Sequence, residues 1–281
     1  MNGKETIGII DSGVGGLTVV KEVMRQLPRE KIVYFGDNAR CPYGSRDSEE
    51  IRTYTNQMIQ FVSQFQLKAL VIACNTAASV VLHEAKERMN SPVIGVIEPG
   101  ARAAISASRT GRIGVIGTEM TIRTGAYLQA MSRINPELYT VGMACPAFVP
   151  LVEQQRLHTE EARQIVTKTL EPFRHEELDT LILGCTHYPL LAPLIQEAMG
   201  DSITLINSAE ETARELSAML SMQGLLNEQQ EIEPKHHLFY TSGSKQVFQQ
   251  IGEEWLECPL NVQQQVLEHA APLILEIMDR L

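Results

Sequence analysis

The chain of 281 residues lacks any apolar stretch close to the roughly 20 residues that a membrane-spanning helix requires. Its amino terminus also lacks the pattern of a secretory signal peptide, so we expect a cytoplasmic protein without a membrane segment. Its five cysteines form neither a CxxC pair nor a disulfide framework, which predicts reduced thiols. Basic residues number 24 against 34 acidic ones, and the net charge of −10 argues against a broad nucleic-acid-binding surface.

Complete cofactor-binding motifs are missing as well. The Gly-rich residues 11–17 follow a predicted strand and open a predicted helix, as a dinucleotide fingerprint does. However, Thr18 occupies the last small position of that fingerprint, and the Lys-Ser/Thr pair of a P-loop is absent. Asp11 would repel a pyrophosphate, whereas exposed backbone N–H groups suit a substrate carboxylate. No lysine lies in a comparable motif for pyridoxal phosphate, since Lys68 precedes a predicted buried strand, so we expect no cofactor.

Two short segments of the chain resemble each other, and each contains a cysteine at the same place. Residues 67–76 read LKALVIACNT, and residues 178–187 read LDTLILGCTH. The apolar run before each cysteine predicts a strand of a parallel sheet that is buried on both faces. Ligands bind outside the carboxyl ends of such strands. We therefore expect Cys74 and Cys185 to lie at a ligand site, one from each half of the chain.

The repeat extends over most of both halves. Strand-like segments, Cys-Pro pairs and the cysteine strands recur in the same order, at an offset of roughly 110 residues. Strands and helices alternate, which predicts an α/β fold of two similar domains with mainly parallel sheets flanked by helices. We expect the domains to be related by internal duplication, with the active site in the interdomain cleft. A composition of 44% hydrophobic and 21% charged residues is ordinary for a globular protein.

The domain boundaries follow from where the repeat begins and ends. A strand expected at residues 237–241 has no counterpart in the repeat, so we assign it to the first domain. Crossovers near residues 98–100 and 207–208 would form a two-segment hinge. A short apolar helix is expected at residues 273–281. The expected parts are a first domain at 1–98 plus 209–262, a second at 99–208 and a C-terminal helical tail at 263–281. Further predicted helices include 17–27, 121–133, 159–170, 189–199, 212–222 and 245–255.

Six motifs, in this order along the chain, resemble those of glutamate racemases in the aspartate/glutamate racemase family. They are DSGVGGL at 11–17, YFGD at 34–37, PYG at 42–44, ACNTA at 73–77, PLVE at 150–153 and GCTHYP at 184–189. The resemblance runs from about residue 7 to at least residue 255. It implies a cofactor-independent racemase that interconverts L- and D-glutamate and supplies D-glutamate for peptidoglycan. It also implies a substrate enclosed between two α/β domains and, commonly, a homodimer.

The resemblance further implies roles for individual residues. Cys74 and Cys185 are the acid/base groups, the first acting on the proton of the D-enantiomer and the second on that of the L-enantiomer. Position in the repeat places Asp11 beside Cys74 and His187 beside Cys185. The remaining catalytic candidates are Asp37 and Glu153. The substrate-binding candidates are Asp11, Ser12, Pro42, Tyr43, Gly44, Asn75, Thr76, Thr118, Thr121, Thr186 and His187.

A pair of thiols suits racemisation without an electron-accepting cofactor. Removal of an α-proton then needs a base on one face of the substrate and an acid on the other, both in a dry site. A free thiol has a pKa of about 8.5, close enough to neutral to serve in either direction. Each cysteine also precedes a predicted helix, whose N–H groups favour the thiolate.

A metal site is not expected, and two other functions remain open at the level of sequence. A metal at the second cysteine would need three or four ligands, and only one histidine lies near either thiol, so we expect no metal. A related racemase or isomerase acting on aspartate, hydantoins or maleate would keep both thiols. A non-catalytic amino-acid-binding protein would need only the loops, and either cysteine would be dispensable. Cys41, Cys145 and Cys258 are expected to be structural.

Overall fold

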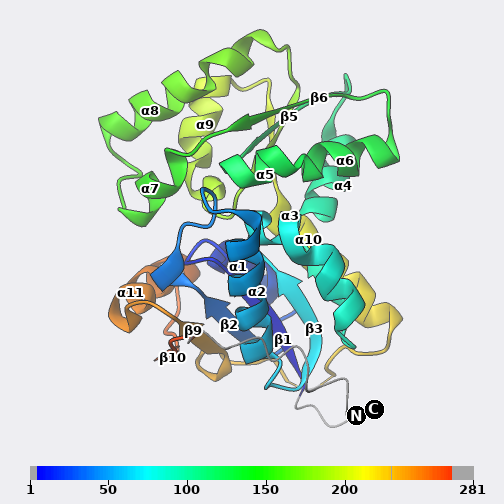
Figure 1. The fold of residues 1–281 in the computed structure, drawn as a ribbon, viewed down its shortest axis with the longest axis vertical. Helices are drawn as coiled ribbons and strands as arrows, with labels where there is room; N and C mark the ends of the chain where they lie inside the picture. The colour runs from blue at the N-terminus through cyan, green and yellow to red at the C-terminus, as the bar shows by residue number, and fades with distance from the viewer. Residues whose placement is uncertain (1–4, 229, 268–281) are drawn as a thin grey trace.

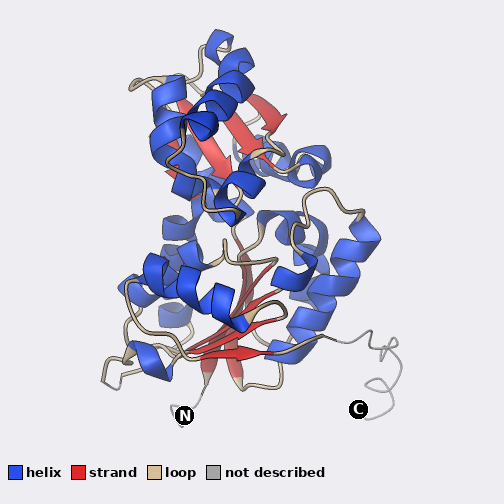
Figure 2. Ribbon diagram, turned by 90° about the vertical axis from the view of Figure 1, so that its left-hand side faces the viewer, coloured by secondary structure: helices blue, strands red, loops and turns tan. Residues whose placement is uncertain are grey.

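The computed structural model describes residues 5–228 and 230–267, which form two stacked halves, each with its own sheet (Figures 1 and 2). No helix within these ranges is long and apolar enough to cross a bilayer. The strands are β1 (Thr6–Asp11), β2 (Ile32–Gly36), β3 (Leu67–Ile72), β4 (Val93–Gly95), β5 (Arg112–Gly117), β6 (Tyr139–Ala144), β7 (Thr180–Gly184), β8 (Thr204–Asn207), β9 (Leu238–Thr241) and β10 (Val262–Gln264).

Helices connect these strands and cover both faces of each sheet. The α-helices are α1 (Leu17–Gln26), α2 (Ser48–Val62), α3 (Asn75–Arg88), α4 (Ile97–Ala107), α5 (Glu119–Thr124), α6 (Ala126–Ile134), α7 (Phe148–Glu153), α8 (Glu160–Leu170), α9 (Ala192–Met199), α10 (Ser208–Met222) and α11 (Lys245–Leu256). The 3₁₀ helices are η1 (Asn38–Arg40), η2 (Glu171–His175), η3 (Tyr188–Leu191) and η4 (Pro234–His236).

The two sheets repeat one strand order. The first sheet has the order β10-β9-β2-β1-β3-β4, and the second has the order β6-β5-β7-β8, with parallel pairing in both. The second order therefore matches the last four strands of the first, with each strand number raised by four. The predicted α/β fold with parallel sheets flanked by helices is confirmed. The proposed domain boundaries stay a prediction, although β9 pairs with β2 and so belongs to the first sheet.

The strands that lead to the site are central and apolar. β1, β2 and β7 are buried along their whole length, and β3 is buried except at its first residue. Continuous burial is what a parallel sheet covered on both faces requires, and it explains the runs of Val, Ile and Leu. The order reverses direction between β1 and β3, and again between β5 and β7. Such switch points open a crevice at the carboxyl ends of the strands, where ligands bind.

Two predicted helices differ from the observed ones. The helix expected at residues 121–133 is divided into α5 and α6 at Gly125, whose φ of +65° is left-handed and ends the first helix. The helix expected at residues 189–199 begins as the 3₁₀ turn η3 and becomes α-helical only at Ala192. The helix expected at residues 273–281 lies outside the described residues.

The chain crosses between the halves at the start of two helices. Glu98, Pro99 and Gly100 lie in the first turn of α4, and residues 207–208 lie where β8 ends and α10 begins, so the two-segment hinge expected at these crossovers stays a prediction. Proline is tolerated in a first helical turn because its missing N–H would have no intrahelical partner there. A Cβ on Gly100 would lie only 3.0 Å from Cβ of Ser208, at the start of α10. Glycine therefore permits the close packing of α4 against α10 where the halves join.

One hydrophobic core extends across this junction. It contains the side chains of the first sheet and also those of Val115, Ile182 and Ile206 from the second sheet. The opposite face of the second sheet, which includes Leu181 and Leu183, packs in a separate cluster with α7, α8 and α9. The second sheet is thus joined to the first half through one face.

A buried histidine beside β2 should make the fold sensitive to acid. Nδ1 of His237 accepts the backbone N–H of Ile32 at 3.2 Å, and burial lowers the pKa of His237 from 6.5 to about 4. The unfolded chain therefore binds a proton at this site before the folded chain does, so its stabilising contribution is lost as the pH falls from about 6.5 through about 4. His237→Asn keeps an acceptor near Nδ1 but removes the titration.

The expected result is a flatter pH dependence of stability in His237→Asn. Between about pH 7 and about pH 4.5, its free energy of unfolding should fall by roughly 2 kcal/mol less than that of the parent chain. Denaturant unfolding of both proteins across this range measures the difference, and other titrating groups cancel in the comparison. If the free energy of unfolding of the two proteins changed with pH in the same way, His237 would not contribute to the pH dependence of stability.

Candidate active site

The carboxyl ends of the two sheets face each other, and loops from both halves meet between them. Thr18, in α1, donates its hydroxyl to the backbone carbonyl of Thr186 at 3.3 Å. The backbone N–H of Met120 donates to the carbonyl of Gly44 at 3.0 Å. A Cβ on Gly44 would lie 2.6 Å from Cβ of Thr118, so glycine is needed for this approach. The predicted substrate loop 42–44 of the first half thus contacts the second half directly.

Cys74 lies buried directly after β3 and caps α3. Its Sγ accepts the backbone N–H of Ala77 at 3.5 Å, and its thiol donates to Oγ of Ser12 at 3.4 Å. Burial, followed by the charge of Asp11, raises the pKa of Cys74 to about 12. The hydrogen bonds to Ser12 and Ala77 act in the opposite direction. The help predicted from the helix N-terminus is therefore present, but burial outweighs it.

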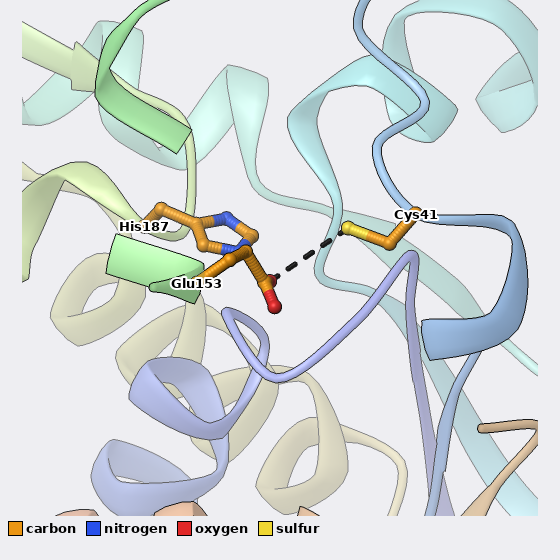
Figure 3. Close-up of side chains that lie close together, drawn as sticks. All are labelled: Cys41, Glu153 and His187. Carbon is orange, nitrogen blue, oxygen red and sulfur yellow. Dashed lines mark hydrogen bonds and ion pairs between the residues drawn. The ribbon is translucent and has the colours of Figure 1, made fainter. Parts of the chain in front are cut away.

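Cys185 occupies the equivalent place after β7 and begins a chain of polar contacts that continues through His187 and Glu153, the last two of which are drawn in Figure 3. Its Sγ lies 3.7 Å from Nδ1 of His187, and Nε2 of His187 lies 2.6 Å from Oε1 of Glu153. Burial acts to lower the pKa of His187, but hydrogen bonds and charges from Cys185 and Glu153 outweigh it, and the pKa is raised well above its usual value. Burial acts to raise the pKa of Glu153, but the contact with His187 leaves it lowered. An imidazolium–carboxylate pair thus supports the second thiol.

Asp11 ends β1 with no exposed surface and contacts both halves. Its Oδ2 accepts the backbone N–H of Gly13 at 3.0 Å, and its Oδ1 accepts the hydroxyl of Thr186 at 3.3 Å. Burial raises the pKa of Asp11 to about 6, against the opposing effects of the His187 charge and these hydrogen bonds. A Cβ on Gly15 would lie 2.4 Å from Oγ1 of Thr186. The lack of a side chain at Gly15 therefore permits this close contact between the halves.

The buried side-chain amide of Asn75 is held in one orientation, and its N–H donor group has no partner among the described residues. The hydroxyl of Tyr127 donates to Oδ1 of Asn75 at 2.7 Å. Nδ2 of Asn75 is buried and has no hydrogen-bond partner among the described residues. A buried donor without an acceptor costs about 1–3 kcal/mol. A substrate carboxylate would provide that acceptor.

Three threonine hydroxyls meet near this amide, from α3 in one half and the start of α5 in the other. Oγ1 of Thr76 lies 2.8 Å from Oγ1 of Thr118 and 3.4 Å from Oγ1 of Thr121. The hydroxyls of Thr118 and Thr121 are 3.0 Å apart. Hydroxyl groups can reorient to donate to a bound carboxylate. The structure thus brings these three predicted substrate-binding residues together.

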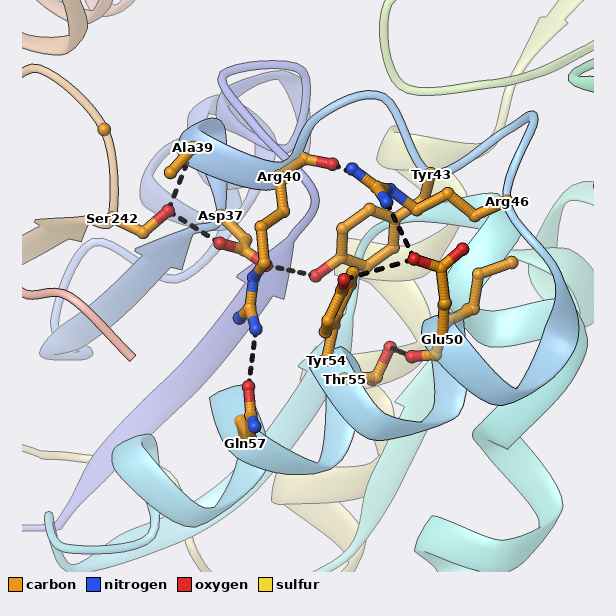
Figure 4. A network of polar contacts seen from close by, with 12 residues as sticks. Asp37, Ala39, Arg40, Tyr43, Arg46, Glu50, Tyr54, Thr55, Gln57 and Ser242 are labelled. Atoms are coloured by element: carbon orange, nitrogen blue, oxygen red, sulfur yellow. Dashed lines mark hydrogen bonds and ion pairs between the residues drawn. The ribbon is translucent and has the colours of Figure 1, made fainter. Parts of the chain in front are cut away.

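Asp37 is engaged in a network that holds the loop after β2 (Figure 4). Its Oδ2 accepts from Nε of Arg40 at 2.6 Å and from the hydroxyl of Tyr43, and its Oδ1 accepts the hydroxyl of Ser242 at 2.6 Å. The guanidinium of Arg40 also lies 4.0 Å from the ring centroid of Tyr54. These contacts fix the loop that carries Pro42, whose preceding peptide bond is cis. They favour a positioning role for Asp37 and Tyr43, and a catalytic role for Asp37 stays a prediction.

Several residues of the site have no signal in the sequence. Tyr127 follows the turn at Gly125 and lies in an apolar helix, where nothing indicates that its hydroxyl orients Asn75. Ser242 follows β9 and reaches Asp37 from more than 200 positions away in the chain. Cys41, expected to be structural, donates its thiol to Oε1 of Glu153 at 3.7 Å. All three contacts join segments that only the tertiary fold brings together.

Comparison with known proteins agrees with this geometry. Residues 7–216 match the model of the Asp/Glu/Hydantoin racemase family. The chain belongs to this family. The residues of this racemase family domain include both cysteine strands and the loops that meet between the sheets.

Several glutamate racemases are similar to this chain over most of its length. A glutamate racemase of Oceanobacillus iheyensis is 52% identical over 250 residues, which cover 89% of this chain and 90% of that protein. The crystal structure of glutamate racemase RacE1 from Bacillus anthracis has 48% identity and a TM-score of 0.90, covering 94% of this chain and 98% of that one. A glutamate racemase from Francisella tularensis, solved in complex with D-glutamate, has 30% identity and a TM-score of 0.87 over 95% and 99% of the two chains.

Proposed function

We propose that the chain is a glutamate racemase that interconverts L- and D-glutamate without a cofactor, using Cys74 and Cys185 as its two acid/base groups. The repeated strand order carries the proposal, because each thiol follows the third strand of its own half. Residues at the carboxyl ends of strands from the two halves also contact each other, as Thr76 contacts Thr118 and Thr186 contacts Asp11. The D-glutamate complex of the Francisella tularensis relative supports the choice of substrate.

The reaction moves one proton off the α-carbon and places another on the opposite face. From D- to L-glutamate, Cys74 acts as thiolate and Cys185 as thiol, and the reverse reaction exchanges these roles. The pKa of Cys74 is raised to about 12, so its ionisation needs help from a positive charge. The ammonium group of glutamate, paired with the buried carboxylate of Asp11, supplies such a charge beside the sulfur. When Cys185 loses its proton, the imidazolium of His187 stabilises the resulting thiolate.

The α-carboxylate must accept additional negative charge as the proton leaves. Nδ2 of Asn75 and the hydroxyls of Thr76, Thr118 and Thr121 are donors that can stabilise it. Preorganised donors in a dry site are the usual means of stabilising such charge. The close approach of Gly44 to Thr118 brings loop 42–44 against this region, where the four donor side chains are at most 7% exposed.

Purified protein should racemise either enantiomer of glutamate in the absence of pyridoxal phosphate, nucleotide or added metal. The change in circular dichroism of each pure enantiomer measures the reaction, and aspartate and a hydantoin serve as comparison substrates. Faster turnover of aspartate would change the assigned substrate. Binding of glutamate without turnover would indicate a binding protein, and a requirement for pyridoxal phosphate or loss of activity on dialysis against a chelator would contradict the cofactor-independent mechanism.

The cellular role rests on the family resemblance. We propose that the D-glutamate product enters peptidoglycan synthesis and that the enzyme acts in the cytoplasm as a homodimer. A supply of D-glutamate for cell-wall assembly would also link the activity to cell shape.

A further inference from the structure

Three side chains of types that bind metals meet beside the second catalytic thiol. Cys41 comes from the loop after η1, Glu153 from the end of α7 and His187 from the loop after β7 (Figure 3). The sulfur of Cys41, a carboxylate oxygen of Glu153 and a ring nitrogen of His187 all lie within 4.8 Å of one another. These segments are far apart in the sequence, which is why no spacing motif indicates the cluster.

We propose that Cys41, Glu153 and His187 bind a thiophilic divalent cation such as Zn²⁺ or Cd²⁺. Thiolate sulfur, imidazole nitrogen and carboxylate oxygen are the three ligand types that Zn²⁺ takes in proteins. With bonds of about 2.0–2.3 Å, tetrahedral geometry separates the ligand atoms by roughly 3.3–3.8 Å. The Sγ–Oε1 distance is already 3.7 Å, and the Nε2–Oε1 pair at 2.6 Å needs to open by about 1 Å.

The surroundings of the cluster suit a cation. Gly13 borders it, and a Cβ there would lie 3.1 Å from Sγ of Cys41 and 3.3 Å from Oε1 of Glu153. Because glycine has no Cβ, Gly13 places no side chain against these two ligand atoms. The side chain of Glu153 is 28% exposed, which gives a cation a route from solvent, whereas that of His187 is only 3% exposed.

The binding step balances in charge and protons. The cation takes the lone pairs of the Cys41 sulfur, Nε2 of His187 and a Glu153 oxygen. The Cys41 thiol and Nε2 of the His187 imidazolium each release one proton to solvent. Two positive charges thus replace two protons, and the cluster keeps the same net charge. A neutral complex avoids the cost of an uncompensated buried charge.

Occupation of this site would also inhibit racemisation, and this consequence rests on the proposed function. Coordination needs the distance between Nε2 of His187 and Oε1 of Glu153 to open from 2.6 Å by about 1 Å, and the cation would replace the direct contact between them. The imidazole ring, whose Nδ1 lies 3.7 Å from the sulfur of Cys185, would then be held by the cation and shifted relative to that sulfur. The site is therefore an inhibitory one, and catalysis does not need the metal.

Binding is tested first, independently of activity. The full chain, freed of metal with a chelator and dialysed, is titrated with Cd²⁺ while the ultraviolet thiolate-to-metal absorption is followed, and with Zn²⁺ in a calorimeter. We expect one cation per chain. Cys41→Ser and Glu153→Gln should bind at least about 100-fold more weakly, because loss of even an outer-shell partner costs about 10- to 100-fold in metal affinity. Cys258→Ser is the matched control, since Cys258 is also partly buried but lies outside the cluster, and it should bind like the parent.

The competing arrangement is a cation held by the two catalytic sulfurs. If Cys74→Ser abolishes binding while Cys41→Ser retains it, the proposed ligand set is wrong. Absence of binding at millimolar metal, in folded protein as judged by circular dichroism, would also overturn it. Inhibition is then measured relative to each variant's own rate, and Cys41→Ser should resist Zn²⁺ where Cys258→Ser does not. Binding with undiminished racemisation would refute the inhibitory role, whereas a chain without racemase activity would refute the proposed function and leave the binding result intact.

Discussion

Replacement of Cys74 or Cys185 by serine should lower the rate of glutamate racemisation by about 10²- to 10⁴-fold, as expected for loss of a general acid–base group. Both side chains are buried, 4% and 6% exposed, and serine fits in either place. An alcohol is a far weaker acid than a thiol, so a serine at either position can neither ionise readily nor donate with the same ease. Polarimetry or circular dichroism from each pure enantiomer measures the loss.

Two controls make this result specific. Cys258→Ser applies the same substitution to a cysteine outside the site and should change the rate by less than about tenfold, because it removes no acid–base group. Racemisation has an equilibrium constant of one, so kcat/KM must fall equally in both directions and cannot assign a thiol to a face. A glutamate analogue with a leaving group at the β-carbon can assign each thiol to one face of the substrate, because elimination of the leaving group needs only one base. Cys74→Ser should eliminate from the L-configured analogue alone, and Cys185→Ser from the D-configured one. If both variants acted equally on the L- and D-configured analogues, the two thiols would not lie on opposite faces of the α-carbon.

Racemisation in D₂O should label the product and leave the remaining substrate unlabelled during early turnover. In the proposed mechanism, one thiol removes the original proton, and the other delivers a deuteron that it has taken from solvent. The removed proton stays on the sulfur of its own face, so it has little opportunity to exchange before it returns. Separation of the enantiomers followed by mass spectrometry measures the deuterium in each.

The experiment is run from both L- and D-glutamate, so that each thiol is tested as the base. A single shared base would exchange its proton with solvent and deliver deuterium to either face. Substrate and product would then gain deuterium at the same rate, and the two-thiol mechanism would fail.

The strands that could be predicted from the sequence are those whose side chains are almost completely buried. β3 and β7 could be predicted because a parallel strand covered on both faces must be continuously apolar. The repeat then indicates that the residues after them are equivalent. Pro99 and Gly100 did not indicate that a helix begins here, because proline fits a first helical turn and glycine also serves close helix packing. The division between α5 and α6 depends on the single left-handed residue Gly125, which a periodic apolar pattern does not show.

The site was predictable where function depends on position at a strand end, and not where it depends on tertiary contact. Asp11 ends β1 and Cys74 comes shortly after β3 of the same sheet, and the charge of Asp11 raises the pKa of Cys74. The orientation of Asn75 by Tyr127 could not be predicted, because these residues come from different halves. The net pKa of Cys74 was also beyond reach, since the sequence indicates the helix N-terminus but not the extent of burial.

The hydrophobic core that crosses the junction has a consequence for how the molecule comes apart. Val115, Ile182 and Ile206 belong to the same cluster as the first sheet, and α4 and α10 pack against each other between the halves. Unfolding of either half would expose apolar surface of the other half to water, at a free-energy cost of about 25 cal/mol for each Å² of apolar surface exposed. The two sheets are therefore thermodynamically coupled, and the folded chain should behave as one cooperative unit although its topology is that of a duplicated pair.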